Sequence, residues 1–307
     1  MSPSPGVTRV PSTAGVTLAV HDLGPAAAGA PALLAHATGF HGRVWLPLAR
    51  HLSGLRAWAP DLRGHGDSPV PEGHDFDWER FADDVLAVVD GLGLTGDRPE
   101  PPVGIGHSKG GTALLLAEAR RPGTFRALWV YEPVISPNGF DPAPDPAGRR
   151  GNRLAASARA RRDRFDSFAA AEANFGAKPP MERFDPEALH EYVHHGFRDG
   201  PGGVSLKCRP ADEARVYEMG GHHDAWNRLR SIRCPVTVVR GSLVAAGPAG
   251  LTAAVAERLP QGHLETHDDL SHFGPMEAPA AMATSILSAV NGVAGAGPAG
   301  GASRGRI

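Results

Sequence analysis

One serine lies at the centre of residues 103–111, which read Val-Gly-Ile-Gly-His-Ser-Lys-Gly-Gly. Gly106 and Gly110 stand two residues on either side of Ser108; an apolar run precedes them and a helix-forming run follows. A strand that turns into a helix within a few residues strains the backbone at the turn and leaves room only for small neighbours. The pattern therefore predicts a sharp turn that exposes the Ser108 hydroxyl as a nucleophile.

This strand–turn–helix segment resembles the nucleophile elbow of the α/β-hydrolase superfamily. Two other glycine motifs do not fit, because Lys109 stands where a dinucleotide fingerprint needs its third glycine and no Gly-Lys-Ser/Thr sequence is present. The resemblance covers roughly residues 30–135 and 232–290. Three further segments match the family in the same order: residues 36–38 (His-Ala-Thr), 61–68 (Asp-Leu-Arg-Gly-His-Gly-Asp-Ser) and 271–275 (Ser-His-Phe-Gly-Pro).

The resemblance implies that a histidine activates Ser108, because a serine hydroxyl needs a base within hydrogen-bond reach. In this family the nucleophile, the acid and the histidine follow one another along the chain. His272 lies between the last expected strand and the last expected helix, whereas His263 and His267 lie on or at the end of that strand. We therefore expect His272 to be the base.

The acid departs from the commonest family pattern. The loop after the expected strand 236–239 reads Gly-Ser-Leu-Val-Ala-Ala-Gly and contains no carboxylate. Glu132 stands one strand earlier, 24 residues beyond Ser108, which fits one helix plus one strand. This placement resembles that of haloalkane dehalogenases, although Ser108 excludes their aspartate-based chemistry. We expect Glu132 to orient His272, with Asp268 or Asp269 as the alternative acid.

Backbone N–H groups must stabilise the oxyanion that forms when a carbonyl is attacked. The resemblance implies that one comes from Lys109, the residue after the nucleophile. The other comes from the loop after an early strand, where Thr38 occupies the donor position and Ala37 replaces the usual glycine. Residues 61–68 are expected to form a tight turn braced by arginine, with a structural role.

Strand-like and helix-like runs alternate along the chain, which predicts an α/β fold: a mostly parallel sheet flanked by helices, with an inserted helical cap. Residues 149–164 hold seven arginines, and the apolar residues Leu154, Ala158, Phe165 and Phe168 are spaced as one face of a helix. The expected organisation is a core at 1–135, a cap at 136–230 after a linker at 138–148, a second core part at 231–291, and a disordered tail at 292–307.

Composition excludes several other classes of protein. A net charge of −2 and a pI near 6.7 give no basis for binding nucleic acid or an anionic membrane. Two cysteines are too few for a disulfide framework. No secretory signal or membrane span is visible, so a cytoplasmic protein is expected. Adjacent histidines at 194–195 and 222–223 point in different directions on a helix or strand, so no metal site is predicted. No cofactor is expected either.

The sequence thus predicts a serine hydrolase that cleaves a small ester or lactone through an acyl-Ser108 intermediate. Carbon–carbon bond hydrolysis or perhydrolysis on the same residues is the alternative within the enzymes. A non-catalytic protein that binds a small ligand is the alternative from another class. The identity of the substrate and the formation of a homo-oligomer are left open.

Overall fold

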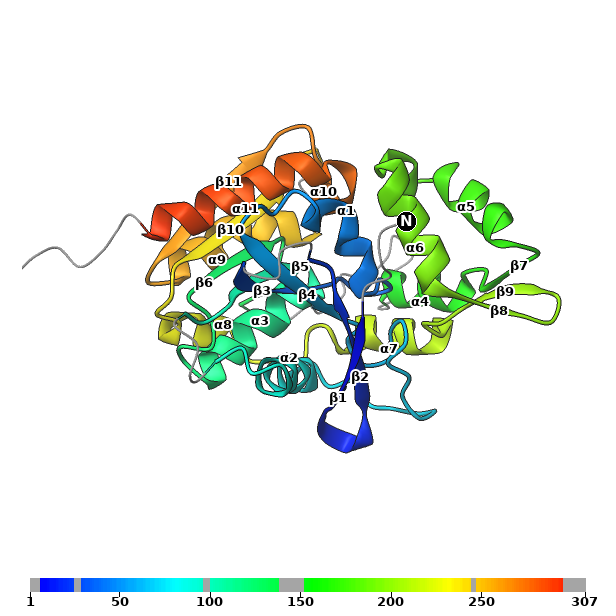
Figure 1. The fold of residues 1–307 in the computed structure, drawn as a ribbon, viewed down its shortest axis with the longest axis horizontal. Helices are drawn as coiled ribbons and strands as arrows, with labels where there is room; N and C mark the ends of the chain where they lie inside the picture. The colour runs from blue at the N-terminus through cyan, green and yellow to red at the C-terminus, as the bar shows by residue number, and fades with distance from the viewer. Residues whose placement is uncertain (1–5, 25–28, 96–99, 138–151, 244–246, 295–307) are drawn as a thin grey trace, which may run out of the picture.

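The computed structural model describes residues 6–24, 29–95, 100–137, 152–243 and 247–294. Its main sheet contains β1 (Val7–Pro11), β2 (Thr17–Asp22), β3 (Ala30–Ala35), β4 (Leu55–Pro60), β5 (Val103–His107), β6 (Ala127–Tyr131), β10 (Val236–Gly241) and β11 (Gly262–His267). The strand order is β1-β2-β4-β3-β5-β6-β10-β11 (Figure 1). β2 runs antiparallel to both of its neighbours, and every other pair in this sheet is parallel. The predicted α/β sheet is confirmed.

Helices cover both faces of the sheet, as parallel strands require. One face carries α2 (Glu79–Gly91), α3 (Lys109–Arg120) and α9 (Thr252–Arg258), and the other carries α1 (Leu46–Ala49) and α11 (Pro279–Ala294). The short α10 (Gly274–Glu277) precedes α11. On α2, Phe81, Val85, Val88 and Val89 are fully buried, which confirms the apolar helix face seen in the sequence.

The cap, residues 136–230, enters between β6 and β10. Within the described residues it contains α4 (Arg153–Ala160), β7 (Arg164–Phe165), α5 (Phe168–Gly176), α6 (Pro186–Gly196), β8 (Phe197–Gly200), β9 (Gly203–Leu206), α7 (Pro210–Met219) and α8 (Ala225–Arg228). Helices α4 to α7 and the small strands lie at one end of the main sheet in Figure 1. The α8 helix returns to the core, where Ala225 joins the apolar cluster around α3. The boundaries of the cap stay a prediction.

Besides its helices, the cap contains three short strands that the sequence did not reveal. Strands β7, β9 and β8 form an antiparallel sheet of three strands. They are only two to four residues long, too short to show an alternating pattern of apolar residues. A glycine turn joins β8 to β9, with φ of 82° at Gly202 and 119° at Gly203.

The expected helix face across residues 149–168 was wrong. Within the described residues, α4 ends at Ala160, Phe165 lies on β7 and Phe168 begins α5. Leu154 is 60% exposed, whereas Ala158, one turn further along α4, is buried, and so is Ala155. The prediction of a single helix was wrong because these apolar residues, although spaced as on a helix, belong to the three elements α4, β7 and α5.

The turn at residues 61–68 is braced as predicted. The Arg63 guanidinium donates to both carboxylate oxygens of Asp84, at 2.9 and 2.6 Å, and both side chains are fully buried. Asp61 accepts from the backbone N–H groups of Gly42 and Asp67 at 2.7 and 2.8 Å. These contacts fix the loop beside the carboxyl end of β4.

The last helix runs to Ala294, past the predicted end of the core at 291. The expected linker at 138–148 and the rest of the expected tail, 295–307, lie outside the described residues. Among the residues with a described structure, no helix has both the length and the apolar character needed to span a bilayer.

Candidate active site

Ser108 stands between β5 and α3 with φ of 53° and ψ of −118°, a strained conformation for a residue other than glycine. The turn is also crowded. A Cβ atom on Gly110 would lie 2.1 Å from the carbonyl oxygen of Ala35, and one on Gly106 would lie 2.6 Å from the Cα of Gly111. The glycines are therefore needed for space, as the sequence indicated, and the strain is concentrated at Ser108.

Glu132 occupies the equivalent place on the neighbouring strand. His107 pairs with Tyr131 across β5 and β6, so Ser108 and Glu132 both follow directly after a paired position. Glu132 also has a positive φ, 43°, and is only 1% exposed. Its Oε1 accepts a 2.9 Å hydrogen bond from the backbone N–H of Gly241, the last residue of β10. The carboxylate is thus held between two strand ends.

His272 lies in the loop between β11 and α10, and its Nδ1 is 2.6 Å from Oε2 of Glu132. A carboxylate only accepts hydrogen bonds, so this contact places the proton on Nδ1 and leaves Nε2 able to accept one. Two residues anchor the loop. The Tyr131 hydroxyl donates to the carbonyl oxygen of Ser271, and Nε2 of His107 donates to that of His272, each at 2.7 Å.

The alternative acids lie elsewhere. Asp268 is exposed and accepts a 2.7 Å hydrogen bond from the Ser242 hydroxyl. Asp269 is exposed as well, and its backbone carbonyl accepts from Arg183 at 3.0 Å. The recorded hydrogen bonds join the His272 ring to Glu132 and to neither aspartate. The structure therefore brings together the histidine and the acid that the sequence singled out.

Thr38 and Lys109 carry the two backbone N–H groups that the sequence predicted as oxyanion donors. Thr38 lies in the buried loop after β3, and Lys109 is the first residue of α3, whose N–H has no partner within its own helix. Among the residues that the structure describes, neither N–H has a hydrogen-bond acceptor. His36 holds the loop, since its Nδ1 donates to the carbonyl oxygen of Ala37 at 2.7 Å and its Nε2 accepts from Leu62 N–H at 3.0 Å.

The Lys109 side chain runs into the core beside its own backbone. Its Nζ lies 3.3 Å from Nε2 of His65 and 4.4 Å from the centroid of the Phe81 ring. Burial disfavours the charged ammonium and lowers the pKa of Lys109 to about 7. Burial, with the nearby Lys109 charge, also holds the pKa of His36 and His65 well below the usual range for histidine.

A cavity of about 680 Å³ lies between the loop that follows β3 and the cap. It reaches Thr38, Gly39 and Phe40 on the core side, and Phe273 next to His272. Its aromatic wall comes from Phe40, Phe175, Tyr192 and Phe273, and the ring centroids of Phe40 lie 5.2 Å from Tyr192 and 6.0 Å from Phe273. This volume is typical of small-molecule sites, and the wall favours apolar groups.

A partly buried ionic network lines the same cavity. Arg161 forms an ion pair with Glu213 and donates a 2.7 Å hydrogen bond to the Tyr192 hydroxyl. A Cβ atom on Gly39 would lie 2.6 Å from Oε1 of Glu213, so the Glu213 carboxylate packs closely against the loop that follows β3. Sequence reasoning missed these residues, because Arg161 and Glu213 are 52 positions apart in a segment without a motif.

Comparison with known proteins identifies the class to which this fold and site belong. Residues 32–285 match the alpha/beta hydrolase family, and the chain therefore belongs to that family. It is 36% identical over 124 residues to the lipase LipV of Mycobacterium tuberculosis, covering 40% of this chain and 44% of that protein. Human monoglyceride lipase is 36% identical over 108 residues, 34% of this chain and 35% of the enzyme. The chain thus spans less than half the length of these two curated relatives.

Solved structures share the fold over almost the whole chain. The peroxisomal alpha-beta-hydrolase Lpx1 of Saccharomyces cerevisiae has a TM-score of 0.76 at 20% identity, covering 100% of this chain and 90% of that one. E-2-(acetamidomethylene)succinate hydrolase has a TM-score of 0.73 at 21% identity, covering 94% and 99%. At these identities the likeness establishes the fold alone.

Proposed function

We propose that this chain is a serine hydrolase that cleaves an ester or lactone of a small molecule through an acyl-enzyme on Ser108. The observation that carries the proposal is the 2.6 Å contact between His272 Nδ1 and Glu132 Oε2, formed in a loop braced by the residue before Ser108. A serine at a strained turn, a histidine and an orienting acid together define acyl transfer chemistry.

The proposed reaction begins when the Ser108 hydroxyl attacks the ester carbonyl and passes its proton to Nε2 of His272. Glu132 stabilises the imidazolium, and the N–H groups of Thr38 and Lys109 bind the oxyanion. The carbon–oxygen bond to the alcohol then breaks, and His272 donates the proton to the departing oxygen. Water, deprotonated by His272, attacks the acyl-Ser108 carbonyl and releases the carboxylic acid and the free serine.

The cavity supports an ester with an apolar acyl group. Its wall of Phe40, Phe175 and Tyr192 lies beside Thr38, the proposed oxyanion donor. An acyl chain against these rings would leave the carbonyl at the core side of the cavity. The names of the relatives agree with ester hydrolysis, since a 25% identical protein of Mycolicibacterium smegmatis, aligned over 78% of this chain, is a monoacylglycerol lipase.

Perhydrolysis is the second candidate. A bifunctional esterase/perhydrolase of Acinetobacter calcoaceticus is 42% identical to this chain over 85 residues. In that reaction hydrogen peroxide, in place of water, would attack the same acyl-Ser108. Oxidation of a halide by the peracid product, measured with and without a carboxylic acid, tests for it.

Labelling with a fluorescent fluorophosphonate tests the proposed nucleophile. We expect the wild-type protein to become covalently labelled and Ser108→Ala to stay unlabelled. Ser157→Ala is the matched control, because Ser157 is a serine that lines the cavity but stands away from the turn. A wild-type protein that hydrolyses none of a panel of p-nitrophenyl esters and lactones, and takes no label, would favour the ligand-binding alternative.

A further inference from the structure

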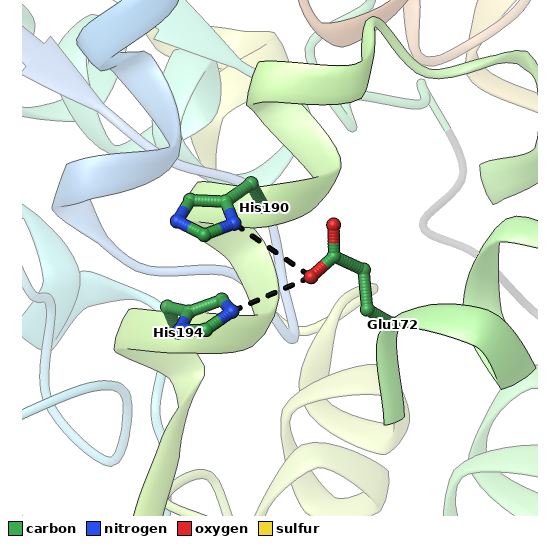
Figure 2. Close-up of side chains that lie close together, drawn as sticks. All are labelled: Glu172, His190 and His194. Atoms are coloured by element: carbon green, nitrogen blue, oxygen red, sulfur yellow. Dashed lines mark ion pairs between the residues drawn. The ribbon is translucent and has the colours of Figure 1, made fainter. Parts of the chain in front are cut away.

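Two histidines of α6 face one glutamate of α5 on the cap (Figure 2). Nδ1 of His190 and Nε2 of His194 lie 3.6 and 3.4 Å from the same oxygen, Oε2 of Glu172. One ligand atom from each of the three side chains lies within 4.8 Å of the others. This cluster is separate from Ser108, Glu132 and His272, and the proposed reaction makes no use of it.

The convergence follows from helix geometry. Residues four apart on a helix share one face, so His190 and His194 project in the same direction, with ring centroids 3.9 Å apart. Phe168 stacks on the other side of His194, at 4.8 Å and an interplanar angle of 15°. Phe168 and Glu172 are also four apart, on α5. Each helix therefore presents two residues to the other, and His194 lies between two rings that fix its plane.

His195, the neighbour of His194, does not join the cluster. Its Nε2 lies 3.5 Å from Oε2 of Glu191, on another side of α6. The divergence of adjacent histidines, expected from the sequence, thus holds. The residue that completes the histidine pair is His190, one turn earlier, and the carboxylate comes from a different helix.

We propose that Glu172, His190 and His194 bind a divalent transition-metal ion, with Zn²⁺ as the expected occupant. Two imidazole nitrogens and one carboxylate oxygen form a ligand set that Zn²⁺ readily accepts, with water in the fourth position. Ligand atoms around tetrahedral zinc are about 3.4 Å apart, given bonds of about 2.1 Å. The ligand atoms must therefore approach one another by at most about 1.4 Å, and the partial exposure of their side chains leaves them room to do so.

The ion would crosslink α5 and α6, two helices that form part of the cavity wall. Phe175 on α5 and Tyr192 on α6 both line the cavity, with ring centroids 5.5 Å apart. Bound Zn²⁺ joins α5 to α6 directly and so fixes the relative position of these two rings. The proposed zinc site takes no part in bond cleavage.

Zinc titration of the full-length, tag-free, metal-stripped protein tests the site. We expect one equivalent of Zn²⁺ to bind with a Kd of about 10 µM or tighter, and Co²⁺ to give visible absorption bands typical of tetrahedral coordination. Removing a ligand in His190→Ala, His194→Ala or Glu172→Gln should weaken binding at least about tenfold. His195→Ala is the matched control on the same helix and should bind Zn²⁺ like wild type.

Circular dichroism establishes that each variant is folded, so that lost binding reports lost ligands. Zn²⁺ should also raise the Tm of the wild type and of His195→Ala, but not that of the His190→Ala/His194→Ala double variant. The proposal is overturned if the wild type binds no Zn²⁺ or binds it with a Kd weaker than about 10 µM. It is equally overturned if both single histidine variants bind as tightly as wild type, because the ion would then lie elsewhere.

Discussion

Replacing Glu132 with glutamine tests the least usual feature of this site. In the structure both carboxylate oxygens accept hydrogen bonds, Oε1 from Gly241 N–H at 2.9 Å and Oε2 from His272 Nδ1 at 2.6 Å. A glutamine has one acceptor oxygen and one NH₂ group. The backbone N–H of Gly241 cannot change its role, so the amide oxygen should face Gly241 and the NH₂ group should face His272.

This arrangement would force His272 into the other tautomer. With an NH₂ group opposite Nδ1, that nitrogen must accept, and the ring proton moves to Nε2, the atom that should receive the proton of Ser108. The negative charge that stabilises the imidazolium is lost as well. In serine triads a change of this kind lowers kcat by about 10⁴. We expect a loss of about 10³–10⁴ in kcat, or about 4–5.5 kcal/mol in the activation barrier.

Steady-state hydrolysis of p-nitrophenyl butyrate measures the effect, with KM expected to change much less than kcat. Asp268→Asn is the matched control, because Asp268 is the alternative acid and hydrogen-bonds Ser242 instead of His272. It should retain activity within about twofold of wild type. Thermal unfolding of Glu132→Gln, followed by circular dichroism, shows that the variant is folded.

A folded Glu132→Gln variant with kcat within tenfold of wild type would refute the assignment of the acid. If Asp268→Asn were the variant that lost activity, the role would pass to Asp268. A loss in kcat with no loss of fluorophosphonate labelling would also contradict the argument, since labelling needs the same base.

Three further predictions concern the framework. Lys109→Met should stabilise the protein more at pH 6 than at pH 9, because the folded-state pKa of Lys109 is lowered to about 7 from 10.5. As pH rises, Lys109 loses its proton in the folded chain before it does in the unfolded chain. The cost of burying the charged ammonium therefore lowers the free energy of unfolding in full below pH 7, and less as pH rises. The stabilisation by Lys109→Met, measured by urea unfolding, should be larger at pH 6 than at pH 9 by at most about 3 kcal/mol. Asp84→Asn should cost about 3–5 kcal/mol in the same assay, since it leaves the buried Arg63 without its counter-ion; an unchanged urea midpoint would contradict this. Gly110→Ala should lower both stability, by about 1–3 kcal/mol, and activity, because the added Cβ would lie 2.1 Å from a backbone oxygen; wild-type values in both measurements would refute the steric argument.

The sequence predicted the core well because each core element has a local signature. The apolar face of α2, the glycines around Ser108 and the loop of Asp61 all arise from short-range periodicity or turn chemistry, and the structure has them in the expected places. Chain order then placed Glu132 and His272 in contact, although they are 140 residues apart. Such a long-range contact followed from the resemblance to a fold, because no local pattern encodes it.

The cap was predicted poorly for the opposite reason. Its strands are too short for a periodic pattern, and the apolar residues thought to share one helix face belong to α4, β7 and α5. The Arg161–Glu213 pair and the Glu172 cluster each join helices that only tertiary packing brings together. Sequence spacing records contacts within an element, so contacts between cap elements left no signal in it.

The position of Glu132, the proposed acid, accounts for the absence of a carboxylate in the loop after β10. Glu132 follows β6, which lies between β5 and β10, so its carboxylate reaches His272 with one oxygen and the end of β10 with the other. Gly241 at that end contributes a backbone N–H, and a Cβ there would lie 2.2 Å from the carbonyl oxygen of Leu270. Because Gly241 donates a hydrogen bond to Glu132, the loop after β10 does not need to supply a second carboxylate for His272. The end of β10 thus contributes to the proposed site through a backbone N–H group that binds Glu132. The two hydrogen bonds to the Glu132 side chain stabilise its strained backbone conformation.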